Sequence, residues 1–295
     1  GMMLLGTDMA AALTTLEMFP IDIIGMNCAT GPQEMSENVR FLTEHARTMV
    51  SVLPNAGLPE NVGGQAHYKL TPSELAAFHE RFVKEFGVNV VGGCCGTTPA
   101  HLAEVVKKIR GLAPKKRTPV HEASASSLYE SVTYQQTPAP LLVGERTNAN
   151  GSKKFKQLLE LEDYDAITQM GRESAQEGSH MLDVCCAYVG RDESRDMIEV
   201  ITRINKQVTV PIMIDSTEAP VIEDALKRIS GKSVINSINL EDGEERMKKV
   251  CPMAKKYGAA LVALTIDEKG MAKERARKVD VAARIYDLAT KKYGI

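Results

Sequence analysis

The sequence lacks several features that would place it in a specialised class of proteins. Its 36 basic and 38 acidic residues give a formal net charge of -2, so there is no basic excess of the kind that binds nucleic acid. No apolar run approaches the ~20 residues that a membrane span needs. The N-terminus has no basic region followed by an apolar core, as a signal peptide would. We therefore expect a cytoplasmic protein without nucleic-acid or membrane partners.

Cysteine is also scarce, because six cysteines in 295 residues are too few for a disulfide scaffold. Their positions matter more than their number. Cys94 and Cys95 are adjacent, as are Cys185 and Cys186, whereas Cys28 and Cys251 stand alone. With no sign of export we expect reduced thiols. A nucleophile–His–Asp grouping is absent too, and none of the six histidines has a ligand or catalytic spacing, so the sequence assigns no catalytic residue.

Apolar runs that alternate with amphipathic helices are the main feature present. Most of the runs lack polar alternation, as expected for parallel strands that are buried on both faces. Thr71-Pro72 with Glu74 predicts a capping box and a helix start, Thr98-Pro99 predicts another start, and Asp192 can cap a third helix. The pattern predicts an α/β fold of the (β/α)8 TIM-barrel type. The eight expected strands lie at 21–26, 48–53, 88–91, 141–143, 180–184, 210–214, 233–238 and 260–266.

One stretch interrupts this alternation. Residues 112–138 are rich in Pro, Ser, Thr and Lys without periodicity, and we interpret them as an extended linker. Three strand units precede the linker, in a domain at 2–111, and five follow it, in a domain at 139–295. Lys and Arg clusters at 246–256 and 269–278 alternate with Glu on helices, and we expect them to be solvated faces.

The cysteines of the first domain follow strand ends. Cys28 follows the first strand, and Cys94 and Cys95 follow the third, so all three thiols are expected at the same rim. Three thiolates leave the fourth tetrahedral position of zinc open for a substrate thiol, which zinc would keep deprotonated. Buried cysteines are often merely small apolar residues. A doublet bounded by glycines, with a third thiol at an equivalent strand end, favours a metal site.

These motifs carry a resemblance. Gly-Gly-Cys-Cys-Gly-Thr-Thr-Pro at 92–99, with Gly-Met-Asn-Cys at 25–28, resembles the zinc motif of homocysteine S-methyltransferase domains. The resemblance covers about residues 2–111, corresponds to the last three strand units of that barrel, and implies Cys28, Cys94 and Cys95 as zinc ligands. Cys185 and Cys186 have no third ligand at suitable spacing, so we interpret this doublet as structural and Cys251 as a core residue.

Polar residues follow the strands of the second domain. Glu145, Asn148, Asp183, Asp215 and Asn236 each lie where an apolar strand meets the rim, an arrangement that suits a planar, amide-rich heterocycle. For any single strand end helix capping is the simpler interpretation, as for Ser216 or Thr217.

The second domain also resembles a known family. Gly-Glu-Arg-Thr-Asn at 144–148, Ile-Asp-Ser-Thr at 214–217 and Asn-Ser-Ile at 236–238 resemble pterin-binding (methyltetrahydrofolate) domains, over about residues 139–295. The resemblance covers the first five strand units of that barrel. It implies that Asp215 and Asn236 hydrogen-bond the pterin ring and that Glu145, Asn148 and Asp183 line the pocket.

The order of the two domains is that of the N-terminal half of the cobalamin-dependent methionine synthase family. The resemblance implies methyl transfer from 5-methyltetrahydrofolate, through cobalamin on a domain outside this chain, to zinc-bound homocysteine, giving methionine. Homocysteine, methyltetrahydrofolate and the cobalamin-binding domain are the implied partners. A stand-alone pterin or corrinoid-protein methyltransferase and an inactive zinc-holding fragment remain alternatives. Three strand units plus five equal the eight of one barrel, so the fold is either one composite barrel or two partial barrels.

Overall fold

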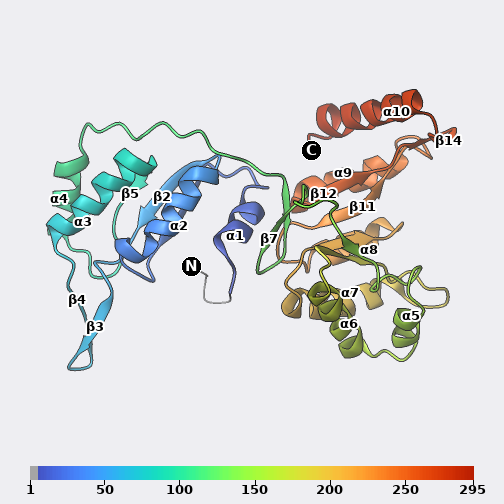
Figure 1. The fold of residues 1–295 in the computed structure, drawn as a ribbon, viewed down its shortest axis with the longest axis horizontal. Coiled ribbons are helices and arrows are strands. Elements are labelled where there is room, and N and C mark those ends of the chain that lie inside the picture. Colours follow the sequence, from blue (N-terminus) through green and yellow to red (C-terminus); the bar gives the residue numbers. More distant parts are fainter. Residues whose placement is uncertain (1–5) are drawn as a thin grey trace. The chain divides into compact units, whose positions relative to one another are not determined.

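The computed structural model describes residues 6–295, which divide into two compact units. Unit 1 comprises residues 6–9 and Phe19–Glu122, and unit 2 comprises Ala10–Met18 and Ala123–Ile295. Figure 1 colours the elements of each unit along the chain. Within the described part of the chain, no helix has the length and apolar character needed to cross a membrane.

Unit 1 is built on a three-stranded parallel sheet in the order β1-β2-β5. Each strand begins in an apolar run that the sequence predicted. An antiparallel hairpin, β3 and β4, projects from the connection after β2. The elements are β1 (Ile23–Asn27), α2 (Pro32–His45), β2 (Met49–Leu53), β3 (Pro59–Val62), β4 (Gln65–Tyr68), α3 (Pro72–Arg81), a π-helical turn η1 (Phe82–Phe86), β5 (Val90–Val91) and α4 (Pro99–Ile109).

The predicted helix starts of unit 1 are confirmed. Thr71 accepts a hydrogen bond from the backbone N–H of Glu74, and the Glu74 carboxylate accepts one from the N–H of Thr71, which completes the capping box of α3. Thr98 opens α4 with Pro99 at its first position. Helices α3 and α4 pack on each other through Leu75, Ala76 and Val105. The start of α4 therefore fixes the chain just after the cysteine doublet.

Unit 2 contains a five-stranded parallel sheet in the order β12-β11-β10-β9-β8, which is simply the reverse of chain order. Its elements are α1 (Met9–Leu16), β6 (Ser124–Ser126), β7 (Ser131–Thr133), β8 (Val143–Gly144), α5 (Lys153–Glu160), α6 (Tyr164–Gln176), β9 (Met181–Val184), α7 (Glu193–Gln207), β10 (Ile212–Asp215), α8 (Ala219–Leu226), β11 (Val234–Ile238), α9 (Glu245–Tyr257), β12 (Ala260–Ala263), β13 (Ile266–Asp267), β14 (Gly270–Met271), α10 (Arg275–Asp287) and η2 (Leu288–Lys292).

The sheet of unit 2 is wound in one direction, with neighbours in sequence also neighbours in space. This order distinguishes a TIM-barrel arrangement from a doubly wound sheet, whose order reverses at a switch point. Leu182, Val184 and Ile214 face the helix layer and join its large apolar core. The alternate residues, including Met181 and Asp183, therefore face the other side of the sheet, which is the interior of a barrel.

The predicted α/β fold of the TIM-barrel type is confirmed. In residues 6–295 the eight predicted strands form two parallel sheets, one in each unit. β5 pairs with β2, β8 pairs with β9, and each of these strands is the edge of its own sheet. Each unit thus contains the sheet of a partial barrel.

A hairpin lies inside the stretch that the sequence assigned to a linker. Strands β6 and β7 pair antiparallel, and Ser124, Ala125 and Ser126 are buried. Ser126 exchanges two hydrogen bonds with Lys232, from its N–H to the Lys232 carbonyl at 3.0 Å and from the Lys232 N–H to its hydroxyl at 2.8 Å. Ala125 packs against Met181, the first residue of β9. The hairpin thus covers the amino ends of the strands of unit 2.

Helix α1 also packs in unit 2, although the sequence placed it in the first domain. Its Ala11 and Leu13 are buried. The Thr14 hydroxyl lies 2.9 Å from that of Ser131, and the Thr15 hydroxyl lies 2.9 Å from that of Ser126. The hairpin is therefore held by a segment more than 100 residues earlier in the chain.

Candidate functional site

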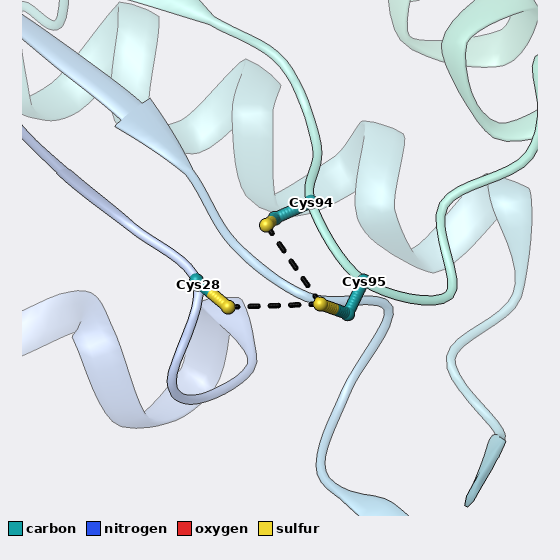
Figure 2. A group of neighbouring side chains, drawn as sticks. All are labelled: Cys28, Cys94 and Cys95. Carbon is teal, nitrogen blue, oxygen red and sulfur yellow. Dashed lines mark hydrogen bonds between the residues drawn. The ribbon is translucent and has the colours of Figure 1, made fainter.

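The three cysteines predicted as metal ligands lie together in unit 1. Cys28 follows β1, and Cys94 and Cys95 follow β5, so the thiols meet at the carboxyl edge of the sheet (Figure 2). The Cys28 sulfur lies 3.6 Å from that of Cys95, which lies 3.9 Å from that of Cys94. All three sulfurs are within 4.8 Å of one another. The structure thus brings together the whole predicted ligand set.

The sulfur spacing fits a tetrahedral metal ion. Zinc–sulfur bonds of about 2.3 Å at tetrahedral angles require sulfurs about 3.8 Å apart. Two of the observed separations fall within 0.2 Å of that value. Cys28 and Cys94 are half-buried and Cys95 is exposed, so a fourth ligand can approach from solvent. The cluster offers a site with three thiolates and one open position.

The backbone around the thiols is held by hydrogen bonds to β2 and the residues after it. The N–H of Cys28 donates to the Leu53 carbonyl at 2.9 Å, and that of Cys94 donates to the Pro54 carbonyl at 2.8 Å. The Asn55 side-chain oxygen accepts from the N–H of Cys95 at 3.1 Å. The end of β2 therefore aligns both cysteine loops.

Two loop residues adopt conformations that are rare for their type. Cys28 and Ala29 have φ of 63° and 61°, in the left-handed region that disfavours residues with a Cβ. Gly96 has φ of 76°, and a Cβ there would lie 2.2 Å from Cγ of Tyr68. Tyr68, at the end of β4, can therefore lie against the doublet loop only because residue 96 is glycine.

The thiols are electrostatically inequivalent. The backbone N–H of Ala29, followed by the neighbouring thiols, hydrogen-bonds the Cys28 sulfur and lowers its pKa. The pKa of Cys94 is raised, first because its thiol shares a hydrogen bond with Cys28. The interaction between these two thiols thus lowers the pKa of Cys28 and raises that of Cys94. A metal ion would ionise the thiols that it binds.

A second cluster of predicted residues lies in unit 2. The Asn148 side-chain nitrogen donates to Asp183 at 2.5 Å and to Asp215 at 2.8 Å. The Asn148 oxygen accepts from the N–H of Asn150 at 2.7 Å, which fixes the orientation of the amide. Thr147 donates to the Asp183 carbonyl at 2.7 Å. We call Asn148, Asp183 and Asp215 the polar cluster.

Asp183 is the least solvated member of the polar cluster. Its side chain is 3% exposed, and one carboxylate oxygen, Oδ1, is buried without a hydrogen-bond partner. Burial raises the pKa of this carboxyl to about 6, and the charge of nearby Asp215 adds to the shift. A buried carboxylate oxygen without a donor is an acceptor available to a ligand N–H.

The other predicted residues lie on adjoining strand ends. Asp215 ends β10 and pairs in register with Asn236 of β11, so both side chains belong to the same rim. Glu145 immediately follows β8 and is exposed. Asp183, Asp215 and Asn236 thus lie in the neighbouring strands β9, β10 and β11, Asn148 lies in the loop after β8, and Glu145 is more open to solvent.

The sequence missed one residue of this rim. Arg246 was predicted to belong to a solvated face, and this prediction is wrong. Its guanidinium donates to the carbonyls of Ser216 at 2.7 Å and Ser237 at 3.0 Å, and also to that of Thr217. Burial lowers its pKa. Arg246 therefore ties the loop after β10 to strand β11, and its place in the first turn of α9 was the available signal.

The remaining cysteines are buried. Cys185, Cys186 and Cys251 are all enclosed, and Asn150 donates to the Cys185 sulfur at 3.5 Å. Burial raises the pKa of Cys185 and of Cys251 to about 11, and that of Cys186 also rises. In the described residues, Cys28, Cys94 and Cys95 form the only group of three His, Cys, Asp or Glu side chains placed to hold one metal ion.

Comparison with known families assigns the second half of the chain to one family. Residues 144–295, more than half of the sequence, match the family of pterin-binding enzymes. The chain belongs to the pterin-binding enzyme family. Residues 1–109 match a second family, homocysteine S-methyltransferase. The two matches fall on the segments in which the motifs resembled these families.

Similarity to individual proteins extends over both halves of the chain. It is 46% identical over 298 residues to a methionine synthase of Mycobacterium tuberculosis, and 46% identical over 303 residues to a methionine synthase of Mycobacterium leprae. Both similarities cover 100% of this chain and 25% of the relative. The predicted resemblance is therefore confirmed, and the chain spans a quarter of the length of these relatives.

Among solved structures, a Xanthomonas albilineans dihydropteroate synthase in complex with indole-2-carboxylic acid and 6-chloroguanine is similar, with a TM-score of 0.41 and 16% identity. That similarity covers 59% of this chain and 61% of the synthase.

Proposed function

We propose that this chain carries the two substrate sites of a cobalamin-dependent methionine synthase. In the full reaction a methyl group passes from 5-methyltetrahydrofolate to cobalamin and then to homocysteine, which becomes methionine. The observation that supports this best is the presence, in one chain, of a three-thiol cluster and a polar cluster in the order of the methionine synthase relatives. The homocysteine site belongs to domain 2–111 and the folate site to domain 139–295, joined by the linker 112–138.

The thiol cluster would hold zinc through Cys28, Cys94 and Cys95. The sulfur spacing fits the ion, and the exposed side of Cys95 leaves room for the substrate sulfur. When bound, zinc supplies a Lewis acid that keeps the homocysteine sulfur deprotonated near neutral pH. The protein holds the three ligands on strand ends and keeps the fourth position open. The cytoplasm is the proposed location, where such thiols stay reduced.

The polar cluster would hold the pterin ring of the folate. Asp215, the last residue of β10, is in register with Asn236 of β11, and the two can hydrogen-bond the edge of a flat heterocycle. Asn148 fixes both carboxylates, and the unpaired Oδ1 of Asp183 can accept a pterin N–H. Glu145 would line the outer part of the pocket. Loss of the methyl group returns an electron pair to N5 of the folate, which a proton must take up.

Substitutions in the two clusters test the proposal because each should affect one site alone. Cys94→Ser removes one thiolate and should weaken zinc binding roughly 100-fold or more. Asp215→Asn should weaken methyltetrahydrofolate binding at least about tenfold, because a charged acceptor is lost. Zinc content, calorimetry with methyltetrahydrofolate, and methyl transfer to homocysteine from added methylcobalamin are measured on both variants.

The expected result is a double dissociation, with Cys94→Ser retaining folate binding and Asp215→Asn retaining zinc and the homocysteine reaction. Methyl transfer that survives Cys94→Ser unchanged would instead indicate a stand-alone pterin or corrinoid-protein methyltransferase. Zinc binding without folate binding in the unsubstituted chain would indicate an inactive zinc-holding fragment. Both results would overturn the proposal.

A further inference from the structure

A proline that immediately follows the central strand of unit 1, β2, leaves one carbonyl of the adjoining strand end without its ladder donor. Ser51 and Val52 of β2 pair with Val90 and Val91 of β5, so the next pair in this register is Leu53 with Gly92. The N–H of Gly92 donates to the Val52 carbonyl at 3.1 Å, as a regular parallel ladder requires. The Gly92 carbonyl should then accept from the residue after Leu53. That residue is Pro54, which has no N–H.

A histidine side chain from helix α3 supplies the missing hydrogen bond. Nε2 of His79 lies 2.7 Å from the Gly92 carbonyl oxygen. Because a carbonyl can only accept, Nε2 must carry the proton, and this fixes the tautomer of the ring. His79 is 0% exposed and lies edge-on to Phe82, with ring centroids 6.1 Å apart. The donor is therefore held in place by packing.

The other nitrogen of this ring makes no bond. Nδ1 of His79 is buried and has no hydrogen-bond partner. Burying such a nitrogen is unfavourable, and a leucine at this position would avoid it. The polar contribution of His79 to its surroundings is thus the single bond to Gly92. Burial lowers the pKa of His79 to about 4, so the ring stays neutral and that bond persists at physiological pH.

The bond is placed where the cysteine doublet begins. Gly92 lies two residues before Cys94, whose N–H donates to the Pro54 carbonyl at 2.8 Å. His79 therefore replaces the missing ladder hydrogen bond at Gly92, the first residue after β5. The loop that carries both thiols begins at this residue. A displaced Gly92 would move Cys94 and Cys95 relative to Cys28, which is held separately by Leu53.

We propose that His79 is a positioning residue for the metal-binding thiols, acting as a substitute for the N–H that Pro54 lacks. The role rests on the proposed metal site. His79 does not touch the ion. Instead, His79 fixes the strand end from which Cys94 and Cys95 reach the metal ion. Side chains that hold metal ligands in this indirect way typically contribute about 10- to 100-fold to metal affinity.

Three variants test the role. His79→Leu keeps the volume of the side chain but removes the donor, and it should weaken zinc binding about tenfold. His79→Gln retains an N–H donor of similar reach and should bind zinc nearly as the unsubstituted chain does. The double variant His79→Leu with Pro54→Ala restores a backbone N–H opposite Gly92, and it should regain most of the lost affinity. Zinc affinity is measured by competition with a chromophoric chelator.

A second readout reports geometry. The thiolate-to-metal absorption of the cobalt(II)-loaded chain should shift in His79→Leu and return in His79→Gln, because ligand angles set that spectrum. Leu75→Ala is the matched control. Leu75 is also on α3 and fully buried, but it contacts Ala76 and Val105 and makes no bond to the loop. It should lower the melting temperature and leave zinc affinity and the cobalt spectrum unchanged.

The outcomes separate this inference from the proposed function. If the unsubstituted chain binds no zinc, the metal site itself is wrong. If it binds zinc and His79→Leu binds it equally well, only the positioning role fails. If Leu75→Ala weakens zinc as much as His79→Leu, or if neither His79→Gln nor the Pro54→Ala double variant restores affinity, the effect is general destabilisation and the positioning role is likewise overturned.

Discussion

The thiol cluster of unit 1 and the polar cluster of unit 2 occupy equivalent places, at the carboxyl ends of parallel strands, but are built differently. The thiols are half-buried or exposed and lie on loops whose backbone is bent to bring them together. The carboxylates and amide lie on strand ends and are held by side-chain hydrogen bonds. The first cluster depends on backbone conformation, and the second depends on burial and charge.

The energetic cost of each cluster differs accordingly. In the thiol cluster the cost is left-handed backbone at Cys28 and Ala29. In the polar cluster the cost is a carboxylate at Asp183 held away from water. Functional sites commonly contain strained backbone or buried charge of this kind, and favourable interactions elsewhere in the fold must offset the lost stability. A backbone substitution should therefore perturb the first site most, and removal of a charge should stabilise the second.

The largest effect is expected at Gly96. Gly96→Ala forces a Cβ against the Tyr68 ring, at 2.2 Å from its Cγ, and adds the strain of a left-handed alanine. We expect the free energy of unfolding of unit 1 to fall by roughly 2–4 kcal/mol, with weaker zinc binding. Thermal denaturation and chelator competition measure the two effects.

Gly63→Ala is the control for Gly96→Ala. Gly63 also has a positive φ, of 60°, but a Cβ there has no atom within 4 Å. Its substitution should cost only about 1 kcal/mol and leave zinc binding unchanged. Equal losses of stability in the two variants would show that the contact with Tyr68 has no energetic role.

An intermediate effect, of opposite sign, is expected at Asp183. Burial raises the pKa of this carboxyl from its ordinary value of 3.8 to about 6. Folding therefore disfavours its charged form, and the stability lost at neutral pH returns as the pH falls through 6 toward 4. Asp183→Asn should raise the free energy of unfolding at pH 7 by about 1–3 kcal/mol while weakening folate binding.

The pH dependence provides the check on Asp183. Urea denaturation of both proteins at pH 7 and at pH 4.5 should show the advantage of Asp183→Asn shrinking at the lower pH, where the native carboxyl is largely protonated. If the difference in the free energy of unfolding between the two proteins does not depend on pH, removal of a buried charge is not the origin of the stabilisation.

The smallest effect is expected at Ala29. Its φ of 61° costs an alanine about 1–2 kcal/mol, whereas glycine adopts it freely but loses more entropy on folding. Ala29→Gly should thus stabilise unit 1 by only about 0.5 kcal/mol and leave zinc affinity unchanged. A clear loss of stability on calorimetric melting would show that the methyl group of Ala29 contributes packing that offsets its strain.

The elements that the sequence predicted well are those with strong local signals. Uninterrupted apolar runs located all eight sheet strands, and Thr71 and Asp192 start the helices that they were expected to cap. The thiol cluster was predictable because its three members follow strands of one parallel sheet, whose carboxyl ends must meet. In both cases residue type and spacing were sufficient.

The features that the sequence missed depend on partners far along the chain. Strand β6 is Ser-Ala-Ser, without apolar alternation, and it forms because Ser126 bonds Lys232, 106 residues away. The bond of His79 to Gly92 follows from the proline just after the neighbouring strand, which no spacing rule reveals. Arg246 resembles its solvated neighbours until the loops that it contacts are in place.

The division of the six cysteines by burial has an analytical consequence. Cys28, Cys94 and Cys95 are open to solvent to some degree, whereas Cys185, Cys186 and Cys251 are enclosed and have raised pKa values. A thiol-reactive chromophore applied to the folded, metal-free chain will therefore label Cys28, Cys94 and Cys95 first. Three fast-reacting thiols then correspond to one vacant cluster, against an internal standard of three thiols that react only on denaturation.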